Sequence, residues 1–308
     1  MSRRAALLAA SCTALLLAGC GDDDGTTTRG STGTTPTTTG TGTTSTTPGT
    51  GTTTGSTSGS AAGPPAASPA QVAALPAGLV PAAPAGDADD ARLVDELRAR
   101  FGRAPAALRR AGSARFRIDL TLSSGPIAGS GSADFRTGAS RNGLSLGSGA
   151  GGSTIDQYND GRTSFTRTGD APWTREVSII PSAPGNSVGL FARQLRVGRA
   201  GAETSVAGVR CRWAAGVVPL RELIEGGGAA DAPQVQSLLR VAKQDAAYPI
   251  GACVSAEGLI AELRYDIAFD RDLGLPGSAG RERFGGRIRF SDFGDAPTVR
   301  RPADLPAG

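Results

Sequence analysis

Apolar and polar side chains alternate along the chain from Ser113 onward, which is the pattern of β-strands with one buried face. The clearest run covers residues 115–122, in which every second residue is apolar: Phe116, Ile118, Leu120 and Leu122. Shorter runs of the same kind follow at 127–135, 144–146, 154–158, 163–168 and 176–180. Glycine, Asn-Gly or Asp-Gly separates these runs and favours tight turns, so the sequence predicts an antiparallel meander of hairpins.

Helical spacing of apolar residues surrounds and interrupts these strands. One helix is expected after Asp87, to be broken by Gly102 and Pro105 and followed by a short helix through Leu108. The remaining expected helices are 188–197, 220–224 and a longer one beginning at Pro233, and the remaining expected strands are 204–217, 248–255, 259–270 and 283–290. In the strand 204–217, Val209, Cys211 and Trp213 share one face. The sequence therefore predicts an α+β domain of roughly 220 residues, which is large enough to bury a core.

The N-terminus has the layout of a bacterial lipoprotein signal peptide. Arg3 and Arg4 precede a short apolar stretch that ends at Leu17-Ala18-Gly19-Cys20, which is the spelling of a lipobox. We expect cleavage after residue 19 and lipidation of the Cys20 thiol, with palmitate among the acyl chains that hold the protein on the outer face of the cell membrane. The alternative is an ordinary secretory signal, which would leave a soluble secreted protein. The apolar stretch is too short for a permanent membrane span.

Residues 20–86, which begin with the lipidated Cys20, are rich in Thr, Gly, Ser, Pro and Ala, with very few large apolar side chains. Such a segment cannot form a core, so it is expected to be a disordered tether between the lipid anchor and a domain of residues 87–308.

Two cysteines remain for the folded domain after the signal peptide leaves and Cys20 is acylated. In an oxidising compartment, Cys211 and Cys253 are expected to form a disulfide. Two buried free thiols are the alternative, because sequence cannot show that the two Cα atoms lie within bridging distance.

The chain contains no histidine, which excludes most catalytic and metal sites. Gly143-Leu-Ser145-Leu-Gly147 has the spelling of a nucleophile elbow, but no histidine could activate Ser145. The glycines of 147–152 lack the helix that a phosphate-binding loop needs, and the stretch from Asp270 lacks the closing glutamate of a calcium loop. Carboxylate pairs, Glu222 with Glu225 and Asp266 with Asp270, are interpreted as surface charge. No catalytic residue, metal or cofactor is expected, and the protein is not predicted to be an enzyme.

Five arginines are close in sequence: Arg193, Arg196, Arg199, Arg210 and Arg212. They could contact phosphate-bearing head groups, or they could be the solvated faces of a helix and a strand. Nucleic acid is not an expected partner, because the protein is expected outside the cytoplasm and because base-stacking aromatic residues are sparse. Protein partners cannot be named from the sequence.

The order of elements and several turns resemble the LppX/LprG family of actinobacterial envelope lipoproteins. The resemblance is carried by the Asp160-Gly161 hairpin, by residues 201–211 (GAETSVAGVRC), by Ala256-Glu-Gly-Leu259 and by the end from Phe290 to Pro302. It implies a LolA-like half-barrel of antiparallel strands wrapped around a few helices, with an apolar cavity. The cysteine pair departs from the family pattern; if bonded, it would join the strands on either side of the helix that begins at Pro233.

The leading hypothesis is a lipid-anchored, non-enzymatic envelope protein that binds or carries a lipid or glycolipid between sheet and helices. Five inward-facing residues are candidates for lining that cavity: Phe116, Ile118, Leu120, Leu122 and Phe135. The same side chains would serve equally well as an ordinary packed core. The alternative function is a surface-binding or scaffolding module without a lipid ligand.

Overall fold

The computed structural model describes residues 64–122, 125–147, 153–161, 163–176, 184–219, 222, 247–269 and 282–306. Within these residues, eleven antiparallel strands form one sheet in the order β6-β5-β4-β3-β2-β1-β11-β10-β9-β8-β7. The strands are β1 Ser113–Leu122, β2 Gly125–Asp134, β3 Ala139–Leu146, β4 Ser153–Asp160, β5 Ser164–Thr168, β6 Thr174–Glu176, β7 Arg196–Val206, β8 Val209–Pro219, β9 Ala247–Val254, β10 Ile260–Phe269 and β11 Glu282–Ser291. The helices are α2 Pro69–Ala73, α3 Ala91–Ala111 and α4 Pro184–Gln194.

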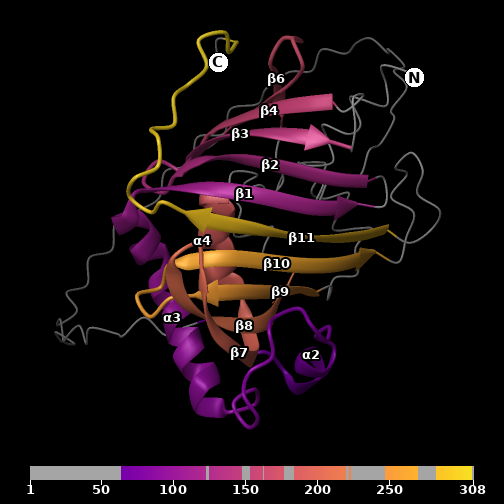
Figure 1. The fold of residues 1–308 in the computed structure, drawn as a ribbon, viewed down its shortest axis with the longest axis vertical. Coiled ribbons are helices and arrows are strands. Elements are labelled where there is room, and N and C mark those ends of the chain that lie inside the picture. Colours follow the sequence, from indigo (N-terminus) through magenta and orange to yellow (C-terminus); the bar gives the residue numbers. More distant parts are fainter. Residues whose placement is uncertain are drawn as a thin grey trace, which may run out of the picture. The chain divides into compact units, whose positions relative to one another are not determined.

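The sheet consists of two meanders that meet in its middle (Figure 1). Strands β1 to β6 follow one another outward, and β7 to β11 follow one another back until β11 pairs with β1. Helix α3 packs on β1 and β7 to β9, and α4 packs on β2, β3 and β8. The predicted fold class, an α+β half-barrel of antiparallel strands wrapped around a few helices, is confirmed.

Helix α3 continues through Gly102 and Pro105, so the prediction of two shorter helices was wrong. Asp90 caps its N-terminus by accepting a 2.8 Å hydrogen bond from the Arg92 amide. Proline inside a helix costs about 3 kcal/mol. The helix buries an apolar stripe of Leu97, Phe101, Ala104, Ala107 and Leu108. Each large apolar side chain contributes roughly 1.5–3 kcal/mol when it is buried, so the burial of the stripe outweighs the cost of the proline.

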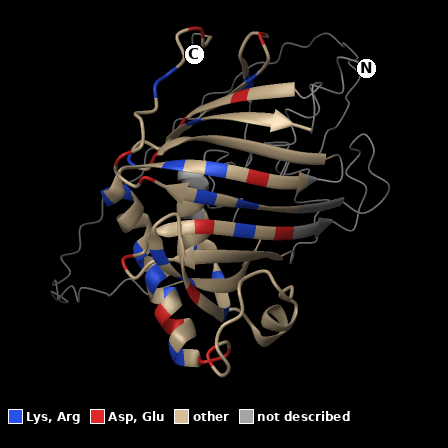
Figure 2. Cartoon of the chain, viewed as in Figure 1, with Lys and Arg blue, Asp and Glu red and all other residues tan. Residues whose placement is uncertain are grey.

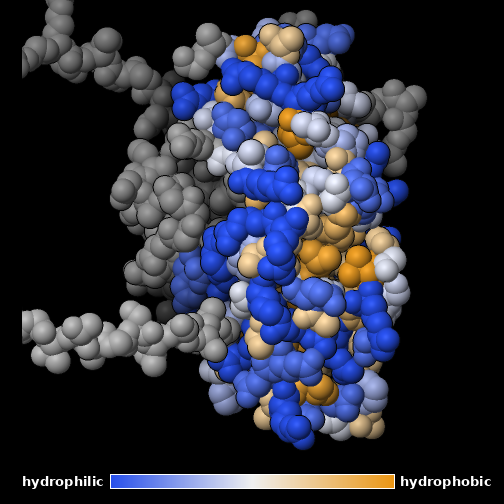
Figure 3. Space-filling view, turned by 90° about the vertical axis from the view of Figure 1, so that its left-hand side faces the viewer, coloured by the Kyte–Doolittle hydropathy of each residue, from blue (hydrophilic) through white to orange (hydrophobic). Residues whose placement is uncertain are grey.

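The face of the molecule that is seen from the left of Figure 1 is mostly hydrophilic, with scattered hydrophobic residues (Figure 3).

The expected single strand at 204–217 is instead the hairpin of β7 and β8. Its turn is Ala207-Gly208, where both residues have positive φ values of 47° and 81°. This turn type matches the twist of paired strands and favours glycine at such a position. The helix expected to reach residue 197 ends at Gln194, which leaves Arg196 to begin β7. The helices expected at 220–224 and from Pro233 lie outside the described residues, apart from Glu222, and so does 177–180 of the strand expected at 176–180.

The packed part of the chain begins before residue 87, where the sequence suggested that a tether would end. Ser68 caps α2, and Leu75 and Leu79 are each 7% exposed because they pack on Ala215 and Val217. Residues 64–86 thus lie on the sheet. A few apolar side chains are sufficient to attach this segment because the sheet already supplies the apolar surface.

No helix in the described ranges is long and apolar enough to cross a membrane.

Candidate functional site

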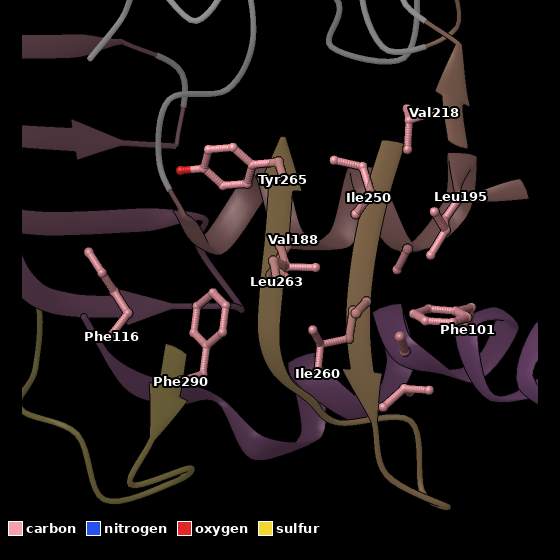
Figure 4. Close-up of a cluster of buried hydrophobic side chains, with 14 of the residues drawn as sticks. Phe101, Phe116, Val188, Leu195, Val218, Ile250, Ile260, Leu263, Tyr265 and Phe290 are labelled. Atoms are coloured by element: carbon pink, nitrogen blue, oxygen red, sulfur yellow. The ribbon is translucent and has the colours of Figure 1, made fainter. Parts of the chain in front are cut away.

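The inner face of the sheet, which α3 and α4 contact, is built from aligned rows of apolar residues. We call one of these rows, which lies toward the end of the sheet away from α3, the distal row. Strand register places its members side by side across seven strands: Leu146, Ile127, Leu120, Gly286, Tyr265, Ile250 and Gly216. Figure 4 shows Tyr265, Ile250 and Val218 at this end, with Phe290, Ile260 and Phe101 at the other. The distal row is therefore a broad strip of uncharged and mostly buried residues.

The neighbouring row toward α3 contains small residues, which lets the helices approach. It consists of Leu144, Gly129, Ile118, Ile288, Leu263, Ala252, Ala214 and Ala200. A Cβ on Gly129 would lie 2.5 Å from a Leu144 methyl group, so the glycine allows Leu144 to lean across the sheet. Val188 and Ala192 of α4, and Leu195 directly after it, belong to the same buried core. The middle of the sheet thus packs directly against the helices.

The expected cavity residues divide between these two environments. Phe116 and Phe135 lie near α3, where the rings of both are about 6 Å from that of Phe290 (6.3 and 6.2 Å between centroids). Leu120 belongs to the distal row, and Ile118 lies between the two ends. All four are buried in one core. The side chain of Leu122 lies outside the described residues.

Two tyrosines give the distal end its polar atoms. Tyr265 belongs to the distal row, and Tyr248 of β9 lies opposite Val218 of β8. Burial raises the pKa of Tyr248 to about 12 and that of Tyr265 further, so both phenols stay protonated. The sequence analysis did not single out either tyrosine, although the alternating pattern of the two strands could have indicated that both face inward. A neutral phenol in an apolar surface can donate a hydrogen bond to an ester or hydroxyl group.

The predicted disulfide between Cys211 and Cys253 is present, with its Cα atoms 5.4 Å apart. The two cysteines lie on the outer face, where they are buried with Trp213 and Ala261. The bond joins β8 to β9, the two strands on either side of residues 220–246.

The arginines that are close in sequence are largely paired with carboxylates. Arg196 pairs with Glu222, and Arg210 is 2.5 Å from Glu203. Arg212 is 3.5 Å from both Asp87 and Glu203. Arg193, which the sequence grouped with them, is an exposed residue near the end of α4. The net positive charge of this region is therefore lower than the five arginines alone would suggest.

Neither expected carboxylate pair is fully described, because Glu225 and Asp270 lie outside the described residues. Within the described ranges, no three Cys, Asp or Glu residues come together as a metal site would require.

The outer face of the sheet is covered at two places. Residues 64–86 cover β7 to β9, and the C-terminal segment covers β4 and β5, where Val299 and Leu305 pack on Tyr158 and Phe165. Asp304 secures this segment by accepting a 3.0 Å hydrogen bond from the Trp173 indole. Between the two covers, charged residues line the outward side of β1, β11 and β10 (Figure 2).

Two open hollows lie on this charged surface. One, of about 460 Å³, has Asp119, Arg264 and Arg287 on its walls. Burial by itself would raise the pKa of the Asp119 carboxyl. Hydrogen bonds from Arg117 and Arg287 have the opposite effect and together outweigh burial, so the pKa is lowered. The other, of about 380 Å³, has arginine and serine as its polar lining residues.

Beneath the charged surface, Glu262 is only 1% exposed. It accepts hydrogen bonds of 2.6 Å from Arg264 and 2.8 Å from Arg289. The Arg264 guanidinium also lies 4.2 Å from the centre of the Trp213 ring. Buried carboxylate and stacked indole together hold these arginine side chains in place.

No protein-family model matches the sequence, and no curated protein is similar to it in sequence. Among solved structures, the crystal structure of the Mycobacterium tuberculosis lipoprotein LppX is similar, with a TM-score of 0.39 and 12% identity over 68% of this chain and 100% of LppX. MucB in complex with MucA(peri) is similar with a TM-score of 0.29 and 14% identity, over 68% of this chain and 58% of MucB. Both likenesses are distant, so the function of this chain is inferred from its own residues.

Proposed function

We propose that this protein is an extracytoplasmic lipoprotein, anchored through Cys20, whose domain binds a hydrophobic ligand such as a lipid or glycolipid against the distal row. The observation that carries the proposal is the composition of that row. Across seven strands it contains only aliphatic residues, glycine and one phenol. A lipid tail needs such uncharged neighbours, and its head group needs a polar atom among them, which the Tyr265 hydroxyl supplies.

Glycine at position 286 lets the middle of the distal row pack closely. It lies between Leu120 and Tyr265, two of the larger side chains of the row. A Cβ there would come within 2.7 Å of a Leu120 methyl group and 2.6 Å of the Asp119 carbonyl oxygen. The Leu120 side chain therefore leans across Gly286, as Leu144 leans across Gly129, and the row stays low and uncharged at this place.

The attachment to the membrane is proposed from the lipobox and the composition of the segment that follows it. Residues 20–63, which contain few large apolar side chains, would form a flexible tether with an r.m.s. span of roughly 35 Å. In an exporting host, Cys20→Ser should move the protein from the membrane fraction to the soluble fraction and abolish labelling by a palmitate analogue. Retention of label by this variant would contradict anchoring at Cys20.

Ligand binding is tested by native mass spectrometry and lipid extraction on protein exported by an actinobacterial host. Leu120→Glu places a charge in the distal row, and the matched control Thr121→Glu places the same charge one residue away on the opposite, exposed face. We expect a co-purifying lipid in the wild type and in the control, and a loss of at least ten-fold in Leu120→Glu.

A second variant covers the possibility that Leu120→Glu does not fold. Leu146 lies in the same row but is only partly buried, so Leu146→Glu should leave the fold intact and still weaken lipid binding. Circular dichroism and thermal melting check the fold of each variant. If folded wild-type protein is consistently empty and does not bind added lipids, the carrier function is wrong.

The packing near α3 favours the second candidate, a surface-binding envelope module. Phe116 and Phe135 are buried against other aromatic rings and the helix, as in an ordinary core. An empty but folded domain would support this function.

A further inference from the structure

The smaller hollow on the outer face is built from a regular grid of polar side chains. Arg115 and Arg117 point outward from β1, and strand register sets their neighbours. Arg117 lies opposite Ser130 of β2 and Arg289 of β11. Arg115 lies opposite Ser132 of β2 and Ser291 of β11. These six residues line the hollow of about 380 Å³, and Ala207 at the β7–β8 turn also contributes to it.

The pairing of Arg117 with Arg289 is unfavourable for the protein alone. Like charges directly opposite each other on neighbouring strands destabilise a sheet. Arg115 adds a third positive charge on the same face of β1, two residues away. The three arginine side chains are 56%, 67% and 40% exposed in the order Arg115, Arg117 and Arg289, so an anion from solution could reach them. A bound anion would relieve the repulsion.

Each of these three arginines contacts a carboxylate through its Nε atom. The Nε of Arg115 contacts Asp292 at 3.1 Å, and the Nε of Arg117 contacts Asp119 at 3.2 Å. The Nε of Arg289 contacts Glu262 at 2.8 Å. Among the described residues, these ion pairs leave the terminal Nη groups for a ligand. Two parallel hydrogen bonds from the Nη groups of one guanidinium are a preferred way to bind an oxyanion.

None of the three carboxylates lines the hollow itself. Its polar side chains are guanidiniums, which only donate hydrogen bonds, and serine hydroxyls, which can donate them. A phosphoryl group fits this set best, because its three oxygens and its charge of up to −2 match three guanidiniums. A carboxylate, with two oxygens and one charge, would leave one arginine unmatched. The volume also exceeds that of a phosphate ion, so part of an attached alcohol could be accommodated.

We propose that this hollow is a phosphoryl-binding site, in which Arg115, Arg117 and Arg289 hold the phosphate oxygens and Ser130, Ser132 and Ser291 donate further hydrogen bonds. The site lies on the face of the sheet opposite the distal row. It therefore does not depend on whether the inner face binds a lipid. The phosphoryl group could belong to a small phosphate ester or to the head group of an anionic phospholipid.

The test uses the mature protein with Cys20→Ser, so that no lipid anchor contributes to binding. Isothermal titration calorimetry with inorganic phosphate and glycerol 3-phosphate measures the first source. Sedimentation with phosphatidylglycerol vesicles, compared with phosphatidylcholine vesicles, measures the second. We expect saturable binding in at least one arm, and the arm in which it occurs identifies the source.

The variants are Arg117→Gln and Arg289→Gln. Arg109→Gln, at an exposed position of α3, is a control that removes the same charge. Each site variant should weaken binding at least ten-fold, whereas the control should stay within two-fold of the parent protein. Arg117 does not contact buried Glu262, so Arg117→Gln tests the site even if Arg289→Gln is destabilised. Leu146→Glu, which is expected to keep the fold, should leave phosphate binding unchanged, which separates this proposal from the lipid proposal.

Three results would overturn the proposal. The first is the absence of binding in both arms at millimolar phosphate and at millimolar lipid. The second is equal binding by the site variants and the control. The third is equally tight binding of succinate, because this would remove the preference for a phosphoryl group.

Discussion

Removal of the disulfide offers a quantitative test of how this domain is stabilised. Cys211 and Cys253 are 42 residues apart in sequence, and the bond closes this loop in the unfolded chain. The chain-entropy relation gives ~4 kcal/mol of stabilisation at 25 °C for a loop of this length. The double variant Cys211→Ala/Cys253→Ala should therefore lose about 4 kcal/mol of unfolding free energy. For a domain of this size the melting temperature should fall by about 10 °C.

The assay is denaturant unfolding of the oxidised wild type and the double variant, followed by the fluorescence of the two tryptophans, with thiol titration to confirm the bond. Because the cysteines are 1% and 0% exposed, dithiothreitol should reduce the native protein slowly and the denatured protein quickly. The reduced wild type, unfolded in the same assay, controls for the alanine substitutions. A loss below 1 kcal/mol in both proteins would refute the loop-closure reasoning and indicate that the unfolded chain already restricts this loop.

Three further predictions follow from buried and paired groups. The pKa values of all three tyrosines are raised above 10, chiefly by burial, and that of Tyr248 is about 12. Absorbance at 295 nm should therefore show little tyrosinate at pH 10. The free energy of unfolding should fall as pH rises from 10 toward 12. A full tyrosine titration centred at pH 10 would contradict the burial. Glu262→Gln should cost about 2 kcal/mol, because hydrogen bonds to charged groups contribute roughly 1.5–3 kcal/mol, and urea unfolding measures the loss. The pKa of Asp119 is lowered from 3.8, so its contribution to stability is present above about pH 4 and is lost as pH falls through the lowered value. Asp119→Asn should make the acid side of the stability profile less steep, and an unchanged profile would show that the two arginines contribute little.

The strands were predictable because an alternating pattern reports directly which side chains share a face. Phe116, Ile118 and Leu120 face inward as expected, and Cys211 and Trp213 share the outward face of β8. The turn at Ala207-Gly208 was missed because Val206 and Val209 continue an extended pattern through it. The interruption by Pro105 was overestimated because local propensity takes no account of the sheet against which α3 packs.

The candidate sites were less predictable, since each depends on residues that are distant in sequence. Leu120 could be assigned to an inner face, but nothing in its neighbourhood shows that Tyr265 lies two strands away with Gly286 between them. Arg117 and Arg289 each look like an ordinary solvent-facing residue of an alternating strand. They become a pair of opposed charges only through the register of β1 with β11.

By itself, the amino-acid sequence determined the patterns that need no partner: the spelling of a lipobox at Cys20, the Thr/Gly/Ser/Pro-rich composition that follows it, strand periodicity and the absence of histidine. Tertiary structure alone decided which strands pair, in which register, and which parts of the outer face stay uncovered. The physical reason is that periodicity specifies the face of a side chain but not its neighbour. The neighbour is chosen by the burial that all the elements achieve together, which joins β1 to β11 across some 160 residues of chain and leaves the arginines between two covering segments.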